Sequence, residues 1–299
     1  MSERSERGPS GPAGGRGAEH VSERSERGPS GPAGGRGAEH VSAYSEIRYE
    51  VDGHVGIITL DRPDARNALT HTTYAELQHA VEHTGARCLV VTGADPAFCS
   101  GDDVKRVMKA AGEQLSKGLR AEPRLTPAAG ALLHTDVPVI AAVNGAAVGW
   151  GMELALMADI RVLSERARLG ELFVKRGLCC DAPGLGRLAQ LVGREAAAEL
   201  LFTGRVVAAE EARELGLARR VVPHEELLPT AVGLAREIAA NPPLAVQRIK
   251  QGLRTALDPD WTELGRWVSA SLGELFQTED HREGVASFLE KREPRYVGR

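Results

Sequence analysis

Short apolar runs separated by amphipathic stretches dominate residues 44 to 200 of the chain. Three of the four runs are almost continuously apolar, as in strands covered on both faces. Helical periodicity lies between them, at Thr72 to His83 and Gly151 to Ala158. This alternation predicts parallel crossovers and an α/β fold. The four runs are "HVGIITL" (54–60), "RCLVVTG" (87–93), "VPVIAAV" (137–143) and "IRVLS" (160–164).

From Glu195 onward the pattern is almost entirely helical. Two further helices are expected between Asp260 and Lys291. We therefore expect a sheet-containing core at 44–200, followed by a helical C-terminal region at 201–299. The amphipathic segments that precede the last two helices are 194–203, 208–215, 225–239 and 243–256.

The first 43 residues follow neither pattern. Residues 2–21, "SERSERGPSGPAGGRGAEHV", recur unchanged as residues 22–41. The repeated unit has almost no apolar face that could stack, and it is rich in Gly, Pro, Ser and mixed charges. We expect residues 1–43 to form a disordered tail. The start of the chain lacks the apolar stretch of a secretory signal.

Composition narrows the class of function. The 299 residues are 42% hydrophobic, with a formal net charge of −4, which argues against a nucleic-acid or anionic-membrane partner. No apolar run approaches the ~20 residues that span a bilayer. The four cysteines are too irregularly spaced for a disulfide framework, so we expect reduced thiols and a cytoplasmic protein.

A glycine-flanked tryptophan in "NGAAVGWGMELA" (144–155) stands directly before an apolar helix. Glycines let a backbone turn sharply and approach another group closely. A helix N-terminus adds free N–H groups and a positive dipole end, which together suit a negative charge. A simple tight strand-to-helix connection is the alternative. A dinucleotide-binding turn is disfavoured, because the G-x-G-x-x-G spacing is missing.

Six motifs in order resemble one known family. The sequence from about Ile47 to Tyr296 is similar to the crotonase superfamily of acyl-CoA enzymes, typified by enoyl-CoA hydratase. The resemblance implies a ββα spiral core and a homotrimer or dimer of trimers. It further implies that the helical C-terminal region at 201–299 serves oligomerisation and covers the active site. It also implies no metal and no cofactor beyond the coenzyme A of the substrate. The motifs are "LDRPDARNAL" (60–69), "FCSGDDV" (98–104), "AAVNGAAVGWGMELALMADIRV" (141–162), "ELFVKRGL" (171–178), "ANPPLAVQRIK" (240–250) and "EDHREGVASFLEKR" (279–292).

The family stabilises a thioester enolate with two backbone N–H groups. By position, the resemblance assigns these donors to Asp102 and Trp150. Ser100, Gly101 and Gly149 lie in the same two motifs and are expected to contact the substrate. Only a backbone N–H is needed at Trp150, so its side chain is permitted, and we expect a non-positive φ there.

Two acidic residues are candidates for proton transfer. Glu153 matches one catalytic glutamate of the hydratases, although an acidic residue in the first turn of a helix also complements the dipole. The second glutamate position falls on Phe173, which can move no proton. Asp181 matches a catalytic aspartate of some family isomerases and of the dehalogenase branch, or it caps the following helix. Glu171 is a stand-in only if the backbone shifts by two residues.

Basic residues are candidates for binding coenzyme A. Arg62 and Arg66 flank the turn after the first strand, and arginine pairs suit phosphate. Arg282 matches a basic residue that reaches the nucleotide in the family. His79 and His83 have the spacing of a metal pair, but no further ligand completes it, so we expect solvated histidines and no metal site.

These residues leave more than one activity open. The resemblance predicts hydration or migration of a double bond in an enoyl-CoA, and the missing second glutamate weakens hydration. Hydrolysis or dehalogenation through Asp181 is a related alternative. A weakly catalytic protein that binds acyl-CoA or RNA is another, although RNA binding needs a basic surface that this chain lacks.

Overall fold

The structure is a computed structural model that describes residues 39–40, 44–104, 117, 121 and 124–299. Residues 37–299 form one compact unit. The predicted disordered tail lies outside the described residues, apart from the two-residue strand β1 (Glu39–His40).

A seven-stranded sheet forms the larger layer, with strand order β1-β2-β3-β4-β6-β8-β11. β1, β2 and β3 pair antiparallel, and every later neighbour from β3 to β11 is parallel. The four apolar runs form β3, β4, β6 and β8, which confirms the predicted α/β class. The strands after β1 are β2 (Ile47–Asp52), β3 (Val55–Leu60), β4 (Cys88–Gly93), β6 (Val139–Val143), β8 (Ile160–Ser164) and β11 (Arg220–Val222).

A four-stranded sheet, in the order β10-β9-β7-β5, forms a second and smaller layer. The consecutive pairs β4–β5, β6–β7 and β8–β9 each place their first strand in the large sheet and their second in the small one. Helix α4 (Trp150–Met157) follows β7, and this alternation produces a ββα spiral. The short strands are β5 (Ala97–Cys99), β7 (Ala146–Val148), β9 (Arg168–Gly170) and β10 (Val207–Ala208).

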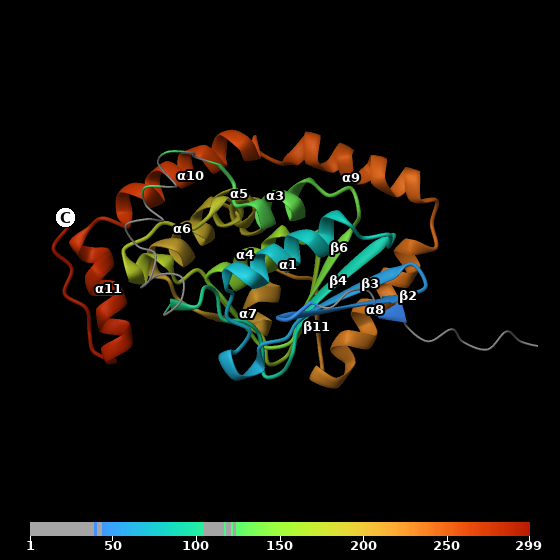
Figure 1. Ribbon diagram of the computed structural model, residues 1–299, viewed down its shortest axis with the longest axis horizontal. Coiled ribbons are helices and arrows are strands. Elements are labelled where there is room, and N and C mark those ends of the chain that lie inside the picture. Colours follow the sequence, from blue (N-terminus) through green and yellow to red (C-terminus); the bar gives the residue numbers. More distant parts are fainter. Residues whose placement is uncertain (1–38, 41–43, 105–116, 118–120, 122–123) are drawn as a thin grey trace, which may run out of the picture. The chain divides into compact units, whose positions relative to one another are not determined.

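Both faces of the large sheet are buried, which explains the continuous apolar runs. Alternate residues such as Val90 and Ile140 pack against helix α8 (Leu227–Ala239) on one face. Their neighbours Leu89 and Ala141 belong to the core formed with α1, α3 and α4 on the other face. Figure 1 shows α8 alongside β2 and β3, with α1 and α3 nearer the opposite side of the sheet.

Helices make up most of the chain after β9, as the sequence predicts. Helices α9 and α10 run in succession over α3 and α5, and α11 lies at one end of the unit (Figure 1). No described helix is long and apolar enough to cross a membrane. The remaining helices are α1 (His71–Glu82), α3 (Pro127–His134), α5 (Ala182–Val192), α6 (Arg194–Thr203), α7 (Ala209–Glu214), α9 (Pro243–Leu257), α10 (Trp261–Leu275) and α11 (Glu279–Glu290), with 3-10 turns η1 (Pro63–Ala65), η3 (Phe173–Arg176) and η4 (His224–Glu226).

Candidate active site

A cavity of about 350 Å³ lies where α1, α3, α4 and α10 meet the ends of the small sheet. Its wall is mostly apolar, and the few polar groups come from separate parts of the chain. We call it the Asp181 cavity. The lining side chains used below are His71, Tyr74, Asp102, Trp150, Phe173 and Asp181.

Two glycines bring the segment after β5 against the start of α4. A Cβ at Gly151 would lie 2.1 Å from the carbonyl oxygen of Cys99, so no side chain fits there. Gly101 adopts a φ of +82°, and a Cβ on it would lie 3.3 Å from the backbone nitrogen of Trp150. Gly149 also has a positive φ, of +54°. The close approach therefore depends on glycine at residues 101 and 151, whereas at residue 149 the positive φ favours glycine.

The backbone N–H groups of Asp102 and Trp150 lie at this contact. Within the part of the chain that the structure describes, neither N–H has a hydrogen-bond acceptor. Trp150 is the first residue of α4 and is not among the residues with positive φ, which confirms the expected backbone conformation. The helix dipole adds partial positive charge at the same place.

The Trp150 side chain links the polar groups of the cavity. Its indole Nε1–H donates to Oδ2 of Asp181 at 3.3 Å. Its ring packs edge-to-face on Tyr74, with centroids 4.7 Å apart, and the Tyr74 hydroxyl donates to Oδ1 of Asp102 at 2.6 Å. The side chains of Asp102, Tyr74, Trp150 and Asp181 therefore form a continuous series. Sequence reasoning missed this role of the indole ring, because only the backbone of Trp150 entered the family comparison.

Asp181 caps a helix and also lines the cavity. Its Oδ1 accepts the N–H of Ala182, the first residue of α5, at 3.0 Å. Burial raises the pKa of Asp181 above its usual range, against the opposing effects of the Ala182 and Trp150 donors. Both sequence interpretations of Asp181 thus fit its position, since capping uses one oxygen and the other faces the indole.

Glu153 lies beside Asp181 but is not among the described residues that line the cavity. Its Oε1 accepts the backbone N–H of Asp181 at 2.8 Å, and its Oε2 accepts that of Gly184 at 2.7 Å. Burial raises the pKa of Glu153 well above its usual value, and the charges of Glu171 and Asp181 add to this. The structure brings the two expected residues together, yet both Glu153 oxygens hold the turn into α5.

Glu171 is buried, and neither of its carboxyl oxygens has a hydrogen-bond partner among the described residues. Burial, followed by the charge of Asp181, raises its pKa well above the usual value. It lines a second cavity of about 530 Å³, which shares Phe173 and Leu178 with the Asp181 cavity. Phe173, at the expected glutamate position, is therefore part of the wall between two cavities.

The side chain of Asp102 is a further polar group that sequence reasoning did not single out. Burial raises the pKa of Asp102 to about 6, although the Tyr74 hydroxyl lowers it, while the charge of Asp181 raises it further. The sequence analysis used only the backbone N–H of this residue. The adjacent acidic residues of "SGDD" (100–103) were the one available signal.

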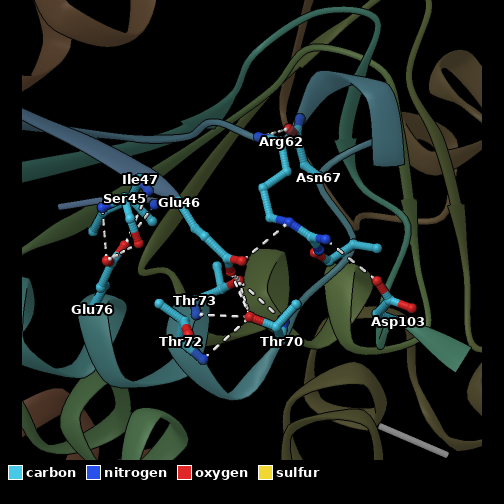
Figure 2. Close-up of polar contacts among 11 residues, drawn as sticks. Ser45, Glu46, Ile47, Arg62, Asn67, Thr70, Thr72, Thr73, Glu76 and Asp103 are labelled. Carbon is cyan, nitrogen blue, oxygen red and sulfur yellow. Dashed lines mark hydrogen bonds and ion pairs between the residues drawn. The ribbon is translucent and has the colours of Figure 1, made fainter. Parts of the chain in front are cut away.

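Arg62 lies in a polar network away from the cavity lining. Its guanidinium donates to the carbonyl oxygen of Ala68 and pairs with Glu46 and Asp103, each at 3.4 Å. Oxygen Oε2 of Glu46 also accepts the hydroxyls of Thr70 and Thr73 (Figure 2). We call Glu46, Arg62, Thr70, Thr73 and Asp103 the Glu46 network. The expectation that Arg62 is free for phosphate does not match these internal partners, which assign its charge to the fold.

The other predicted binding residues are dispersed. Arg66 is exposed and has a φ of +53° in the turn after η1. Ser100 donates its hydroxyl to the carbonyl oxygen of Ala65 at 3.3 Å, which joins this turn to the segment after β5. Arg282 is exposed on α11 and donates to the carbonyl oxygens of Gln277 and Thr278, and it is not among the described residues of the Asp181 cavity.

Histidines and other metal-ligating side chains do not gather anywhere in the described ranges, where no group of three could hold a metal ion. His79 instead accepts or donates a hydrogen bond with the Tyr44 hydroxyl at 2.9 Å and stacks on His83.

Two relatives of this chain are named as hydratases of coenzyme A thioesters. The short-chain-enoyl-CoA hydratase of Clostridium acetobutylicum is 34% identical over 81% of this chain and 94% of its own length. The mevalonyl-coenzyme A hydratase SIDH of Beauveria bassiana is 38% identical over 81% of this chain and 90% of its own.

Solved structures give the same result for the architecture. The crystal structure of carnitinyl-CoA hydratase from Mycobacterium avium is 32% identical, superimposes with a TM-score of 0.72, and covers 85% of this chain and 99% of the other. This structural similarity confirms the crotonase fold that the motifs predicted. The sequence pattern of the enoyl-CoA hydratase/isomerase family matches residues 50–299. The chain is therefore an enzyme of the enoyl-CoA hydratase/isomerase family, within the crotonase superfamily.

Proposed function

We propose that this enzyme moves the double bond of an enoyl-CoA between the 3,4 and 2,3 positions, with Asp181 as its acid–base group. One observation carries the proposal. Asp181 lines the cavity beside Trp150, whereas both oxygens of Glu153 are held by backbone N–H groups behind it. The carboxylate that faces a bound acyl group is then Asp181.

The backbone N–H groups of Asp102 and Trp150 serve as an oxyanion hole in this proposal. Two observations support this role. Gly101 and Gly151 allow the segment after β5 to approach the start of α4, and neither N–H has an acceptor among the described residues. In the reaction a proton leaves C2 for the Asp181 carboxylate, and the electron pair of the C–H bond spreads to the thioester oxygen. Fixed donors that meet this developing charge typically contribute ~10²–10³ in rate each.

Migration of the double bond fits the cavity better than addition of water. A hydratase uses two carboxyl groups that share one water, one accepting and one giving a proton. Here Phe173 lies at the second glutamate position and presents a ring, and Glu153 is committed to the backbone. Hydration stays a second candidate, because Asp102 and Asp181 both line the cavity and two carboxyls can hold a water.

Mass spectrometry in deuterated water separates the two reactions. The protein is incubated with 2-enoyl-CoA and with 3-enoyl-CoA of short chain length, and the products are weighed. Isomerisation gives interconversion of the two substrates with deuterium uptake and no added water. A gain of one whole water would replace the proposal by hydration, and no reaction with either substrate would refute both.

The exposed apolar face of α9 supports the proposal of a homotrimer or dimer of trimers. Ile249, Leu253 and Leu257 follow at four-residue spacing and are 64%, 54% and 64% exposed. Such a stripe is typical of a helix that meets another surface. Analytical ultracentrifugation tests the assembly: a monomer at micromolar concentration would contradict it.

We propose further that the enzyme is cytoplasmic and needs no cofactor besides the coenzyme A of its substrate. All four cysteines are free, which fits a reducing compartment. The proton-transfer groups and N–H donors of the proposed reaction all belong to the chain. Unchanged turnover after exhaustive dialysis against a chelator is the expected result.

A further inference from the structure

We propose that the side chain of Asp102 is a second proton-transfer group of the Asp181 cavity. Asp181 serves C2 of the acyl group, and Asp102 serves C4. The proposal rests on the proposed double-bond migration, and it gives a catalytic use to a side chain whose backbone alone had been assigned a role.

Geometry is the first support. Asp102 and Asp181 both line the cavity, and each is held by one donor from a neighbouring aromatic residue. The Tyr74 hydroxyl donates to Oδ1 of Asp102 at 2.6 Å, and the Trp150 indole donates to Oδ2 of Asp181 at 3.3 Å. The Asp102 carboxyl has no other hydrogen-bond partner among the described residues, so Oδ2 is free for a bound acyl group.

The electrical surroundings of Asp102 are the second support. The titratable side chains that act on it are Tyr74 and His71 of α1 and the carboxyl of Asp181. Burial outweighs the Tyr74 hydrogen bond and raises the pKa of Asp102 to about 6. A carboxyl group with a pKa near the working pH exchanges protons readily in both directions.

Proton transfer by the two aspartates gives a balanced reaction. Starting from a 3-enoyl-CoA, the carboxylate of one aspartate takes the C2 proton, and the electron pair forms a dienolate. The protonated carboxyl of the other aspartate gives its proton to C4, where the new C–H bond uses electrons of the dienolate. One proton then moves through water between the two carboxyls, which restores the starting state. No oxidant, reductant or co-reactant is needed.

The test separates the C2 step from the whole migration. Exchange of the C2 protons of butyryl-CoA in deuterated water needs an enolate and one base, but no group at C4. Asp102→Asn and Asp181→Asn are each assayed for this exchange and for migration. We expect both variants to lose migration by ~10²–10⁴. Asp181→Asn should also lose the exchange, whereas Asp102→Asn should keep it. Asn keeps the backbone N–H of residue 102 and an oxygen that accepts from Tyr74.

Asp103→Asn is the matched control, because Asp103 neighbours Asp102 but pairs with Arg62 outside the cavity lining. It should retain wild-type exchange and migration. The proposal is overturned if Asp102→Asn keeps at least a third of wild-type migration. It is also overturned if Asp103→Asn loses as much as Asp102→Asn, or if both cavity variants lose both reactions. Wild-type enzyme without C2 exchange or migration would instead refute the proposed function itself.

Tyr74→Phe tests the catalytic role through the pH profile of kcat/KM, which would not change if Asp102 had a purely structural role. The tyrosine hydroxyl stabilises the charged form of Asp102 and so lowers its pKa. Its removal should shift one limb of the pH profile of kcat/KM to higher pH, and that limb should be absent in Asp102→Asn. A profile identical to wild type would contradict the assignment.

Discussion

The carboxylates of the Glu46 network and those of the Asp181 cavity differ in how many hydrogen-bond donors surround them. In the Glu46 network, Glu46 and Asp103 meet two threonine hydroxyls and the guanidinium of Arg62 (Figure 2). In the Asp181 cavity, Asp181 and Asp102 each have one side-chain donor, and Glu171 behind them has none. Asp102 and Asp103 are adjacent in sequence and belong to different groups. The comparison teaches that acidic residues of one type serve different purposes according to their partners: the donor-rich acids hold the fold together, whereas burial raises the pKa of Asp102, Asp181 and Glu171.

Asp181→Asn should give the largest effect and test the cavity side of the comparison. Loss of a general acid–base group typically lowers the rate ~10²–10⁴-fold. Asn can still accept the N–H of Ala182, so the helix cap and the fold should survive. Double-bond migration and the thermal midpoint are measured together. A variant with near wild-type turnover would remove Asp181 from the chemistry.

Glu46→Gln should instead damage the fold and spare the chemistry. The change leaves Arg62 with a weaker partner and removes charged hydrogen bonds, which contribute about 1.5–3 kcal/mol each. Denaturant unfolding should show a loss on the order of 2 kcal/mol, with turnover of the folded enzyme little changed. Asp64→Asn on the exposed turn η1 is the control and should be neutral. Loss of turnover without loss of stability would contradict the assignment of this network to the fold.

Glu171→Gln should change how stability depends on pH. The folded protein raises the pKa of Glu171 well above 4.5, mainly through burial, so the folded state keeps a proton that the unfolded state releases. This contribution to stability is fully present below pH 4.5 and is lost as the pH rises toward the folded-state pKa. In the wild type, the free energy of unfolding should therefore decline with rising pH, and the variant should reduce the slope of this decline by about 1.4 kcal/mol per pH unit.

The measurement is denaturant unfolding of the wild type and Glu171→Gln across the range from pH 4.5 to 8. Glu76→Gln, in α1, is the comparison, because the Glu76 carboxylate has partners: it accepts the backbone N–H groups of Ser45, Glu46 and Ile47. An unchanged slope for Glu171→Gln would mean that Glu171 is not held in its neutral form.

Arg66→Gln should have the smallest effect. It tests whether Arg66, unlike Arg62, is available to bind a coenzyme A phosphate. Arg66 is exposed, whereas Arg62 is held by internal partners. If Arg66 meets a coenzyme A phosphate, KM should rise about fivefold, as expected for one exposed charged contact of ~1 kcal/mol. A pantetheine thioester without the nucleotide should show no such rise. An equal rise with both substrates would place the effect elsewhere.

The sequence predicted the four central strands β3, β4, β6 and β8 of the large sheet, because burial on both faces leaves a local apolar signal there, and it did not predict β1, β2 or β11. The runs at 54–60, 87–93, 137–143 and 160–164 are apolar on both faces, and all four became strands of the buried layer. The small sheet was missed, because strands such as Ala146–Val148 and Val207–Ala208 are too short to show periodicity.

The site was predictable in its backbone and less so in its side chains. The motifs gave the positions of Gly101 and Gly149, because their positive φ values favour glycine, and they gave the position of Trp150 beside Gly149. The direction of the Glu153 carboxylate depends on which N–H groups lie 28 to 31 residues away in sequence, at Asp181 and Gly184. No local pattern contains that information. The internal partners of Arg62 are hidden for the same reason.

The contact between Gly151 and Cys99 also bears on how far such a sequence can drift. Here one backbone segment packs directly on another, because a Cβ at Gly151 would lie 2.1 Å from the Cys99 carbonyl oxygen. The shapes of core side chains do not enter this contact. Relatives keep only 34% to 38% of these residues. A contact that requires only the absence of a side chain at residue 151 is insensitive to most replacements elsewhere in the core, so the pocket wall can change without moving these two backbone segments apart.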